Sequence, residues 1–377
     1  MRRIRSFLAM DILEASLTLG TQGHSVISLA LGEPDLDPPK IAIQALQKAL
    51  ARKVTKYTHS QGTLELRQAI TEHYRKKYGV RISPERVVVT PGTSPAMLIA
   101  LGALLEVRDE VLLSDLHYPC YPNFLYFLGA KPRFIKTQSK NGFHFTPEQA
   151  RQALRPKTKA LWITSPSNPT GHVLSANTLA QFAKLKKFMI SDEIYHGLTY
   201  EAKEHSILEF TDQAFVFNGF SKAYAMTGFR LGYVIVPDAF IEPIRKLQQS
   251  FYISTNSFVQ AAGLAVLQKG AVAQRHIRKI FMQRRKVILS ELAALGMKAA
   301  VAPQGAFYVL VDVRKWTNDS YKFAFDLLKQ AHVAVTPGID FGKAGLGYIR
   351  FSYANSITNI KEAFKRIGKF LLTNRRT

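Results

Sequence analysis

The stretch that decides the fold of this chain runs from Gly219 to Tyr233 and reads GFSKAYAMTGFRLGY. It follows the apolar segment 214–218, whose length and composition predict a β-strand. Lys222 therefore comes just after the end of a predicted strand, and Arg230 comes eight residues later. Because α/β sheets place their ligand sites at the carboxyl ends of strands, we expect both side chains to line a binding site.

Two further polar stretches follow apolar strands earlier in the chain. The first, TSPSNPTG at 164–171, contains two prolines and a glycine, which predict a rigid turn that fixes the amide of Asn168. The second, ISDEIYH at 190–196, ends a strand with the carboxylate of Asp192. Each stretch alone is moderate evidence for a site, and a lone lysine or Asn-Pro pair is usually structural. Their ordered combination favours a functional site.

Strands and helices alternate from about residue 43, which is typical of an α/β domain with a mostly parallel sheet between helices. Seven segments have the composition of buried strands: 87–89, 110–114, 131–135, 160–164, 188–191, 214–218 and 232–236. A long amphipathic helix at 273–295 then precedes short strands at 307–311, 332–335 and 348–352 mixed with helices, which predicts a smaller α+β domain. We therefore expect a large domain over 43–275 and a small domain built from 1–42 and 276–377.

The composition excludes several classes of protein. Lys and Arg number 51 against 27 acidic residues, a net charge of +24, and such a surface could bind nucleic acid. However, no helix-turn-helix, zinc finger or aromatic RNA platform accompanies the charge, so a solvated basic face is favoured and no nucleic acid is expected. No apolar run approaches the roughly 18 residues of a membrane span. The single cysteine, Cys120, excludes an internal disulfide and a cysteine-built zinc site, and indicates a cytoplasmic setting without a metal.

The three polar stretches resemble motifs of the class I/II aminotransferases of fold type I, close to the bacterial aspartate-aminotransferase-like branch. The patterns S-P-x-N-P-T-G, S-D-E-I-Y and S-K-x-x-x-M-T-G-[FW]-R-x-G-Y occur in the family's order and spacing, and the likeness extends from Gly32 to Arg350. It implies the pyridoxal-phosphate (PLP) transferase fold with PLP as cofactor. It also implies ping-pong transfer of an amino group between an L-amino acid and a 2-oxo acid, with 2-oxoglutarate as the default acceptor.

The residue types suit this chemistry. A lysine amine whose pKa is lowered by its surroundings can form a Schiff base with a carbonyl cofactor, and Lys222 is the candidate. A buried aspartate beside the pyridine nitrogen keeps that nitrogen protonated, which suits Asp192. By resemblance, Asn168 and Tyr195 hydrogen-bond the phenolic oxygen of PLP. Lys222, Asp192 and Tyr195 are therefore the predicted catalytic residues.

A phosphate requires backbone donors at a helix N-terminus and a fixed cation. The segment 90–94 precedes an apolar helix predicted at 96–105 and can supply the donors. By resemblance, Thr93, Ser94 and Arg230 bind the phosphate. The family often has serine three residues before the lysine, where this chain has Gly219, and Ser221 is the candidate replacement.

Four further positions take their roles from the resemblance. Tyr118 matches the aromatic residue that stacks on the pyridine ring, and Tyr57 matches the tyrosine that reaches the phosphate of the neighbouring subunit, which implies a homodimer with shared active sites. An arginine within an apolar strand is costly unless paired, and Arg350 matches the residue that binds the substrate α-carboxylate in bidentate fashion. Gly32 and Asn168 would supply the remaining carboxylate contacts.

Two alternatives stay open at this point. The same scaffold supports PLP-dependent C–S β-elimination, although the tyrosine at position 195 favours an aminotransferase. A PLP-binding regulatory protein is a weaker alternative, because Gly32 lies too near the N-terminus for a preceding DNA-binding domain. No second arginine stands out for a side-chain carboxylate, so aspartate, aromatic and other neutral amino acids all remain candidate donors.

Overall fold

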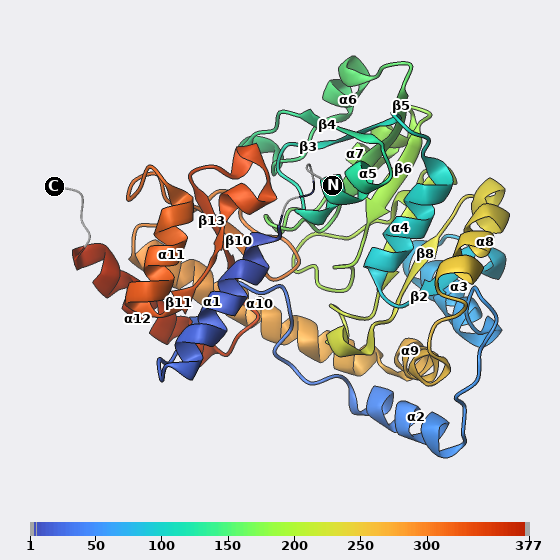
Figure 1. Cartoon of the computed structure of the whole chain (residues 1–377), viewed down its shortest axis with the longest axis horizontal. Coiled ribbons are helices and arrows are strands. Elements are labelled where there is room, and N and C mark those ends of the chain that lie inside the picture. The colour runs from blue at the N-terminus through green and yellow to red at the C-terminus, as the bar shows by residue number, and fades with distance from the viewer. Residues whose placement is uncertain (1–3, 5, 374–377) are drawn as a thin grey trace.

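The computed structural model describes residue 4 and residues 6–373. A seven-stranded sheet lies at its centre (Figure 1). Its strands, in spatial order, are β2 (Val87–Thr90), β8 (Gly232–Ile235), β7 (Ala214–Gly219), β6 (Phe188–Asp192), β5 (Thr158–Thr164), β3 (Glu110–Ser114) and β4 (Lys131–Ile135). The central pairs are parallel, whereas β8 is antiparallel to both of its neighbours. The predicted α/β fold with a mostly parallel seven-stranded sheet is therefore confirmed.

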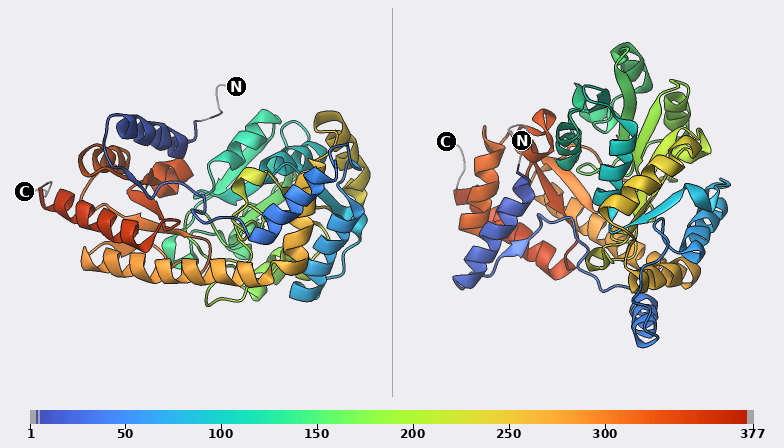
Figure 2. Two further views of the ribbon diagram at one scale, coloured as in Figure 1. Left: turned by 90° about the horizontal axis from the view of Figure 1, so that it is seen from below. Right: turned by 45° about the vertical axis from the view of Figure 1, so that its right-hand side comes forward.

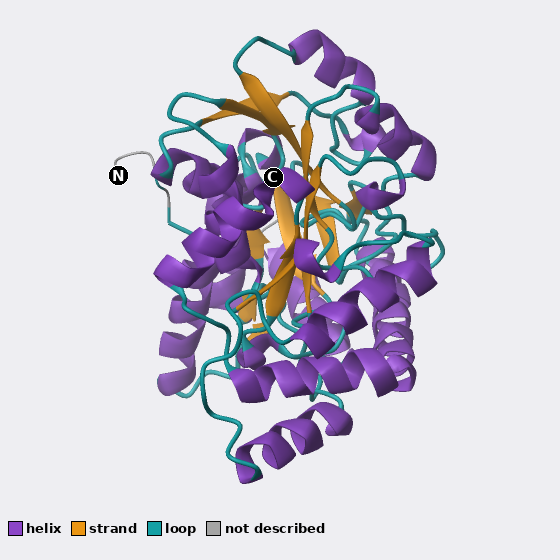
Figure 3. Ribbon diagram, turned by 90° about the vertical axis from the view of Figure 1, so that its right-hand side faces the viewer, coloured by secondary structure: helices purple, strands orange, loops and turns teal. Residues whose placement is uncertain are grey.

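Helices cover both faces of this sheet, as Figure 3 shows. Alternate residues of each strand point to opposite faces, so Val88 and Val234 join one hydrophobic cluster while Val87 and Val89 join another. The first cluster includes residues of α4 (Thr93–Leu104), α5 (Cys120–Phe127) and α8 (Ile241–Phe251). The second includes residues of α3 (Leu64–Tyr78), α6 (Pro147–Ala153), α7 (Ala176–Ala183) and α9 (Ser257–Lys269). Burial on both faces explains why the strands read as continuous apolar runs.

A second, antiparallel sheet lies toward the C-terminal end. Its order is β12 (Thr336–Pro337), β13 (Tyr348–Ser352), β10 (Tyr308–Asp312) and β9 (Lys298–Ala299). The helices of this region are α10 (Ala271–Ala294), α11 (Ser320–Ala331) and α12 (Ile357–Thr373), and Figure 2 shows α10 running along one side of the molecule. The strand expected near 332–335 is instead two short strands that belong to different sheets, β11 (Val333–Ala334) and β12.

The N-terminal segment packs on this second region. Helix α1 (Leu8–Thr21) contacts β11 and β12, and β1 (Ile27–Ser28) pairs in parallel with β11. Helix α2 (Lys40–Ala51) packs instead against α9. The expected domain boundaries, 42/43 and 275/276, fall inside helices α2 and α10. The division of the chain into a large and a small domain at these residues stays a prediction.

Helix α3 was not among the elements predicted from the sequence, although it carries clear local signals. Leu66, Ile70 and Tyr74 recur at the four-residue spacing of a helix face and are fully buried. The Thr63 hydroxyl accepts a hydrogen bond from the Leu66 amide at the N-terminus, and Gly79 ends the helix with φ +73°. Its last turn lies behind the candidate site described below. In the described part of the chain, no helix is long and apolar enough to cross a membrane.

Candidate active site

A cavity of about 310 Å³ lies between the carboxyl ends of β6 and β7 and the second sheet. Every predicted site residue except Tyr57 lines it: Gly32, Thr93, Ser94, Tyr118, Asn168, Asp192, Tyr195, Ser221, Lys222, Arg230 and Arg350. The Tyr57 side chain is 80% exposed and lies outside the cavity. Residues more than 300 positions apart in the sequence therefore meet at the edge of the sheet where α/β folds bind ligands.

Lys222 follows β7 and extends across the cavity. Its Nζ donates a hydrogen bond of 2.6 Å to the carbonyl oxygen of Gly32. Burial lowers the pKa of the amine to about 8, because desolvation disfavours the charged form and the Arg230 and Arg350 cations act in the same direction. A minor fraction of the amine is therefore neutral, and so nucleophilic, at pH 7, and about half is neutral near pH 8.

Asp192 is the last residue of β6 and is held by two donors. The Tyr121 hydroxyl donates to Oδ2 at 2.6 Å, and the Ile194 amide donates to Oδ1 at 3.2 Å. Burial raises the pKa of the carboxyl to about 6 even so. A cationic partner in the cavity would stabilise the ionised form.

Tyr121 lines the cavity but was not predicted as a site residue. Its ring stacks on Trp162 with the ring centroids 4.2 Å apart, and its hydroxyl also lies 2.9 Å from the Thr164 hydroxyl. The available signal was its position three residues after Tyr118, which places both side chains near the start of α5. The contact with Asp192 joins residues 71 positions apart and could be identified only from the fold.

Arg350, on β13, is 1% exposed and has most of its guanidinium bound. Nη1 donates to Asn168 Oδ1 at 2.9 Å, and Nη2 donates to the Thr336 hydroxyl at 3.1 Å and to the carbonyl oxygen of Ala30. The ring centroids of Tyr308 and Phe341 lie 4.4 and 4.8 Å from its Cζ. The Nε atom is buried without a hydrogen-bond partner, which is costly unless a ligand supplies an acceptor. A carboxylate would supply one.

The N-terminus of α4 forms a third polar wall. Helix α4 begins at Thr93, and its N-cap residue, Gly92, provides no side-chain cap, so the first amides of the helix are available to an anion. Gly92 has φ +103°, and a Cβ at this position would lie 2.7 Å from Nη2 of Arg230. Glycine therefore lets the Arg230 guanidinium approach the N-terminus of the helix.

Gly219, where the chain departs from the expected serine, has a packing reason. A Cβ at this position would lie 2.9 Å from both the Cα of Gly232 and the carbonyl oxygen of Leu231. Gly232 is the first residue of β8, and Leu231 precedes it, so both contacts are with backbone atoms. A serine at 219 would therefore require β7 and β8 to move apart. Ser221 is buried and lines the cavity, as expected of the candidate replacement.

Comparison with known proteins decides the family. Residues 24–367 match the family model for aminotransferase class I and II. The chain belongs to this family. The predicted fold type I and the predicted aminotransferase function are thereby confirmed, and nothing in the comparisons favours the lyase alternative.

Similar proteins extend over the full length of this aminotransferase. The (5-formylfuran-3-yl)methyl phosphate transaminase of Methanocaldococcus jannaschii is 43% identical, with 97% of both chains covered. The aspartate/prephenate aminotransferase of Thermus thermophilus is 36% identical, with 94% of both chains covered. The solved aspartate aminotransferase of T. thermophilus with maleate superposes with a TM-score of 0.93 at 35% identity, covering 98% of this chain and 97% of that structure.

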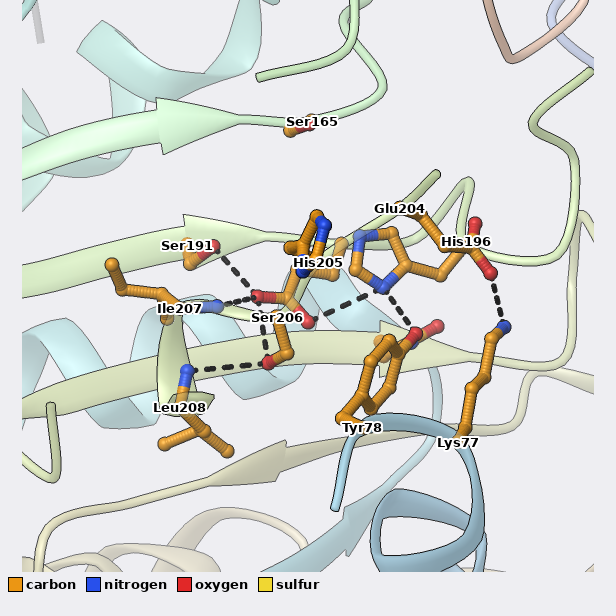
Figure 4. A network of polar contacts seen from close by, with 12 residues as sticks. Lys77, Tyr78, Ser165, Ser191, His196, Glu204, His205, Ser206, Ile207 and Leu208 are labelled. Atoms are coloured by element: carbon orange, nitrogen blue, oxygen red, sulfur yellow. Dashed lines mark hydrogen bonds and ion pairs between the residues drawn. The ribbon is translucent and has the colours of Figure 1, made fainter. Parts of the chain in front are cut away.

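Behind the cavity of the aminotransferase lies a second buried polar group, shown in Figure 4. Glu193 follows Asp192 but points away from the cavity, and its Oε1 accepts hydrogen bonds from the Ser191 hydroxyl, the Ser206 hydroxyl and the Ile207 amide at 3.0–3.1 Å. Its Oε2 lies 3.4 Å from Nδ1 of His196, which in turn lies 2.6 Å from the Tyr78 hydroxyl. We call Glu193, His196 and Tyr78 the rear cluster.

The rear cluster joins the last turn of α3 to the turn that follows β6 and carries Tyr195. Burial raises the pKa of Glu193 to about 8 and lowers that of His196 to about 4. Beside the cluster, Lys77 forms an ion pair with Glu204, which also accepts from the Gly197 amide. His196 thus lies in a buried network outside the cavity.

Proposed function

We propose that this aminotransferase holds PLP on Lys222 and uses it to move an amino group between an L-amino acid and a 2-oxo acid by a ping-pong mechanism. The observation that carries the proposal is that three groups line one cavity. They are a lysine amine with a lowered pKa, a buried carboxylate at Asp192 and a buried arginine whose Nε has no protein partner. The amine suits the carbonyl group of the cofactor, the carboxylate suits the ring nitrogen of the cofactor, and the arginine suits the carboxylate of the substrate.

The residues of the cavity fit PLP from each side. Asp192 would face the pyridine nitrogen, Tyr118 would lie against the ring, and Asn168 and Tyr195 would donate to the phenolic oxygen. The uncapped N-terminus of α4 would hold the phosphate together with Thr93, Ser94, Ser221 and Arg230. When bound, PLP supplies the electron sink that makes the substrate Cα acidic.

The chain's own groups bind the substrate and move the proton. Arg350 orients the α-carboxylate through its unpartnered Nε, and Asn168 keeps the guanidinium in place. The Lys222 amine, about half neutral near pH 8, would accept the proton from the substrate Cα as a general base. The same amine would then deliver this proton to the aldehyde carbon of the cofactor. Phe7 and Tyr118 both line the cavity and form a T-shaped contact with the ring centroids 5.7 Å apart.

The lining of the cavity disfavours donors with an acidic side chain, and it includes the carboxylate of Glu33. Among the described residues its cations are Lys222, Arg230 and Arg350, each of which already has a proposed partner. Phe7, Leu31 and Tyr308 supply apolar surface instead. The named relatives act on substrates that differ widely, so the donor has to be established by experiment.

A homodimer completes the proposed site. The exposed Tyr57 is proposed to cross the subunit interface and to donate to the phosphate bound by its partner. We place the enzyme in the cytoplasm on the basis of its single cysteine, and we propose small-molecule amino and oxo acids as its partners, with no nucleic acid and no metal.

The decisive experiment adds single L-amino acids to PLP-loaded protein and records the absorbance spectrum. We expect the band of the lysine-bound cofactor to disappear with a suitable donor and to return when an oxo acid is added. Lys222→Ala should show no such band and should lose multiple turnover, because the amine both holds the cofactor and moves the proton. Release of pyruvate and ammonia from cystathionine, with the band returning unaided, would instead indicate a lyase.

A further inference from the structure

Tyr308 is a buried residue of the cavity whose hydroxyl has no role in the proposed function. It is the first residue of β10, in the second sheet, and it is 1% exposed. Its hydroxyl lies 2.8 Å from the hydroxyl of Tyr195, which follows β6 of the large sheet. A single hydrogen bond thus connects the sheet that carries Arg350 with the turn that follows Asp192.

Three neighbours fix the position of the Tyr308 side chain. The Cζ of Arg350 lies 4.4 Å from the centroid of the Tyr308 ring. The rings of Tyr195 and Tyr308 form a T-shaped contact with their centroids 5.6 Å apart. A Cβ on Gly32 would lie only 2.1 Å from the Tyr308 hydroxyl, so this hydroxyl occupies space that only a glycine leaves open. The hydroxyl is therefore confined between Tyr195 and the backbone of Gly32.

The direction of the hydrogen bond between the two hydroxyls follows from counting protons. A tyrosine hydroxyl has one proton to donate and can accept as well. In the structure either hydroxyl can be the donor of the pair. If Tyr195 donates its proton to the phenolic oxygen of the cofactor, it has none left for Tyr308. Tyr308 must then donate to Tyr195.

We infer that Tyr308 is a positioning residue that donates its hydroxyl proton to Tyr195 and so directs and strengthens the hydrogen bond from Tyr195 to the cofactor. The inference rests on the proposed function. Consecutive hydrogen bonds polarise one another, so a hydroxyl that accepts a bond becomes a better donor. Burial raises the pKa of the Tyr308 hydroxyl, which keeps its proton available to donate, and the Arg350 cation over the ring acts in the opposite direction. The carboxylate-binding arginine and the cofactor-binding tyrosine thereby share one neighbour.

The test is a spectrophotometric pH titration of the lysine-bound cofactor in PLP-loaded protein. Tyr308→Phe keeps the ring over Arg350 and removes only the donated proton. A weaker bond from Tyr195 destabilises the phenolate of the cofactor, so the pKa read from the spectrum should rise. A neutral hydrogen bond contributes about 0.5–1.5 kcal/mol, so the expected rise is about half to one pH unit.

Two further variants separate this role from a structural one. Tyr195→Phe should raise the same pKa further, and adding Tyr308→Phe to it should then change nothing, because the residue through which Tyr308 acts is gone. Tyr353→Phe is the matched control: Tyr353 is also fully buried in the second region, and its hydroxyl donates to the Ala306 carbonyl at 3.2 Å, away from the cavity. It should titrate as the wild type does.

The outcomes distinguish the inference from the proposed function. A wild-type pKa in Tyr308→Phe, an equal rise in Tyr353→Phe, or additive rises in the double variant would overturn the role of Tyr308. Wild-type protein that forms no lysine-bound cofactor band would overturn the proposed function itself. Thermal melting of each variant shows whether the fold is retained.

Discussion

The amine of Lys222 lies 2.6 Å from the carbonyl oxygen of Gly32, so the residue proposed to hold the cofactor touches the segment proposed to contact the substrate carboxylate. This carbonyl accepts a hydrogen bond from the amine, and such a bond favours the charged form of the amine. The amine nevertheless has a pKa of only about 8, because burial and two neighbouring arginines disfavour its charge. The cofactor-free protein therefore holds the lysine ready to react near neutral pH.

The first prediction concerns the recombination of the cofactor-free protein with PLP. Only the neutral amine can attack the aldehyde, so the rate should rise with pH and level off above about pH 8. For an unperturbed lysine the rise would continue to about pH 10.4. Stopped-flow absorbance across pH 6–10 measures the rate. A rate still rising tenfold between pH 9 and pH 10 would contradict the lowered pKa.

Much of the site could be predicted because its residues follow strands in recognisable stretches. Lys222, Asp192 and Asn168 each follow an apolar segment, and the end of a parallel strand fixes where such a residue lies. The strands themselves are short apolar runs bounded by turn residues, and β3, β4 and β13 begin and end where the sequence predicts. These features depend on local sequence, so the sequence was sufficient for them.

The contacts between distant segments could not be predicted in the same way. Tyr121 reaches Asp192, and Tyr308 reaches Tyr195, through hydrogen bonds that depend on how the two sheets pack. In the sequence both tyrosines read as ordinary apolar packing residues. The rear cluster was also missed, because it requires α3 and the position of Tyr78 at its end.

The second prediction concerns Arg350. Arg350→Lys keeps the charge but cannot reproduce the planar fork that the guanidinium offers to a carboxylate. A hydrogen bond to a charged group contributes about 1.5–3 kcal/mol, so kcat/KM should fall about 10–100-fold for every amino acid donor. Steady-state kinetics with several donors measures the change. Arg314→Lys is the control, because Arg314 is exposed and pairs with Asp312 on the surface. Equal kcat/KM in Arg350→Lys and the wild type would exclude this role.

The third prediction concerns Tyr57 and the dimer. The wild-type protein should be a dimer by light scattering, and Tyr57→Phe should remain one. Loss of one hydrogen bond to the phosphate should weaken PLP binding about tenfold or more. Equilibrium dialysis against PLP gives the dissociation constant, and Tyr321→Phe, on the exposed face of α11, serves as the control. A monomer that binds PLP with full affinity would show that the site is not shared.

The last prediction concerns Glu193 of the rear cluster and the pH dependence of stability. The pKa of this carboxyl is about 8 in the folded protein against an ordinary value of 4.5, so the folded state keeps a proton that the unfolded state releases. The free energy of unfolding should therefore fall as pH rises from 4.5 to 8, by on the order of a few kcal/mol from this group. Glu193→Gln has no proton to release and removes this contribution.

Other buried groups titrate in the same range, so the test compares variants. Asp192, with a raised pKa, acts in the same direction, and His196, with a lowered pKa, acts in the opposite one. Both remain in Glu193→Gln, so the difference between the variant and the wild type isolates Glu193. Urea unfolding at pH 5, 6.5 and 8 should show that difference moving in favour of the glutamine variant. Glu148→Gln, an exposed residue paired with Arg151, should show no trend. A difference independent of pH would mean that Glu193 is ionised in the folded protein, with its three donors outweighing its burial.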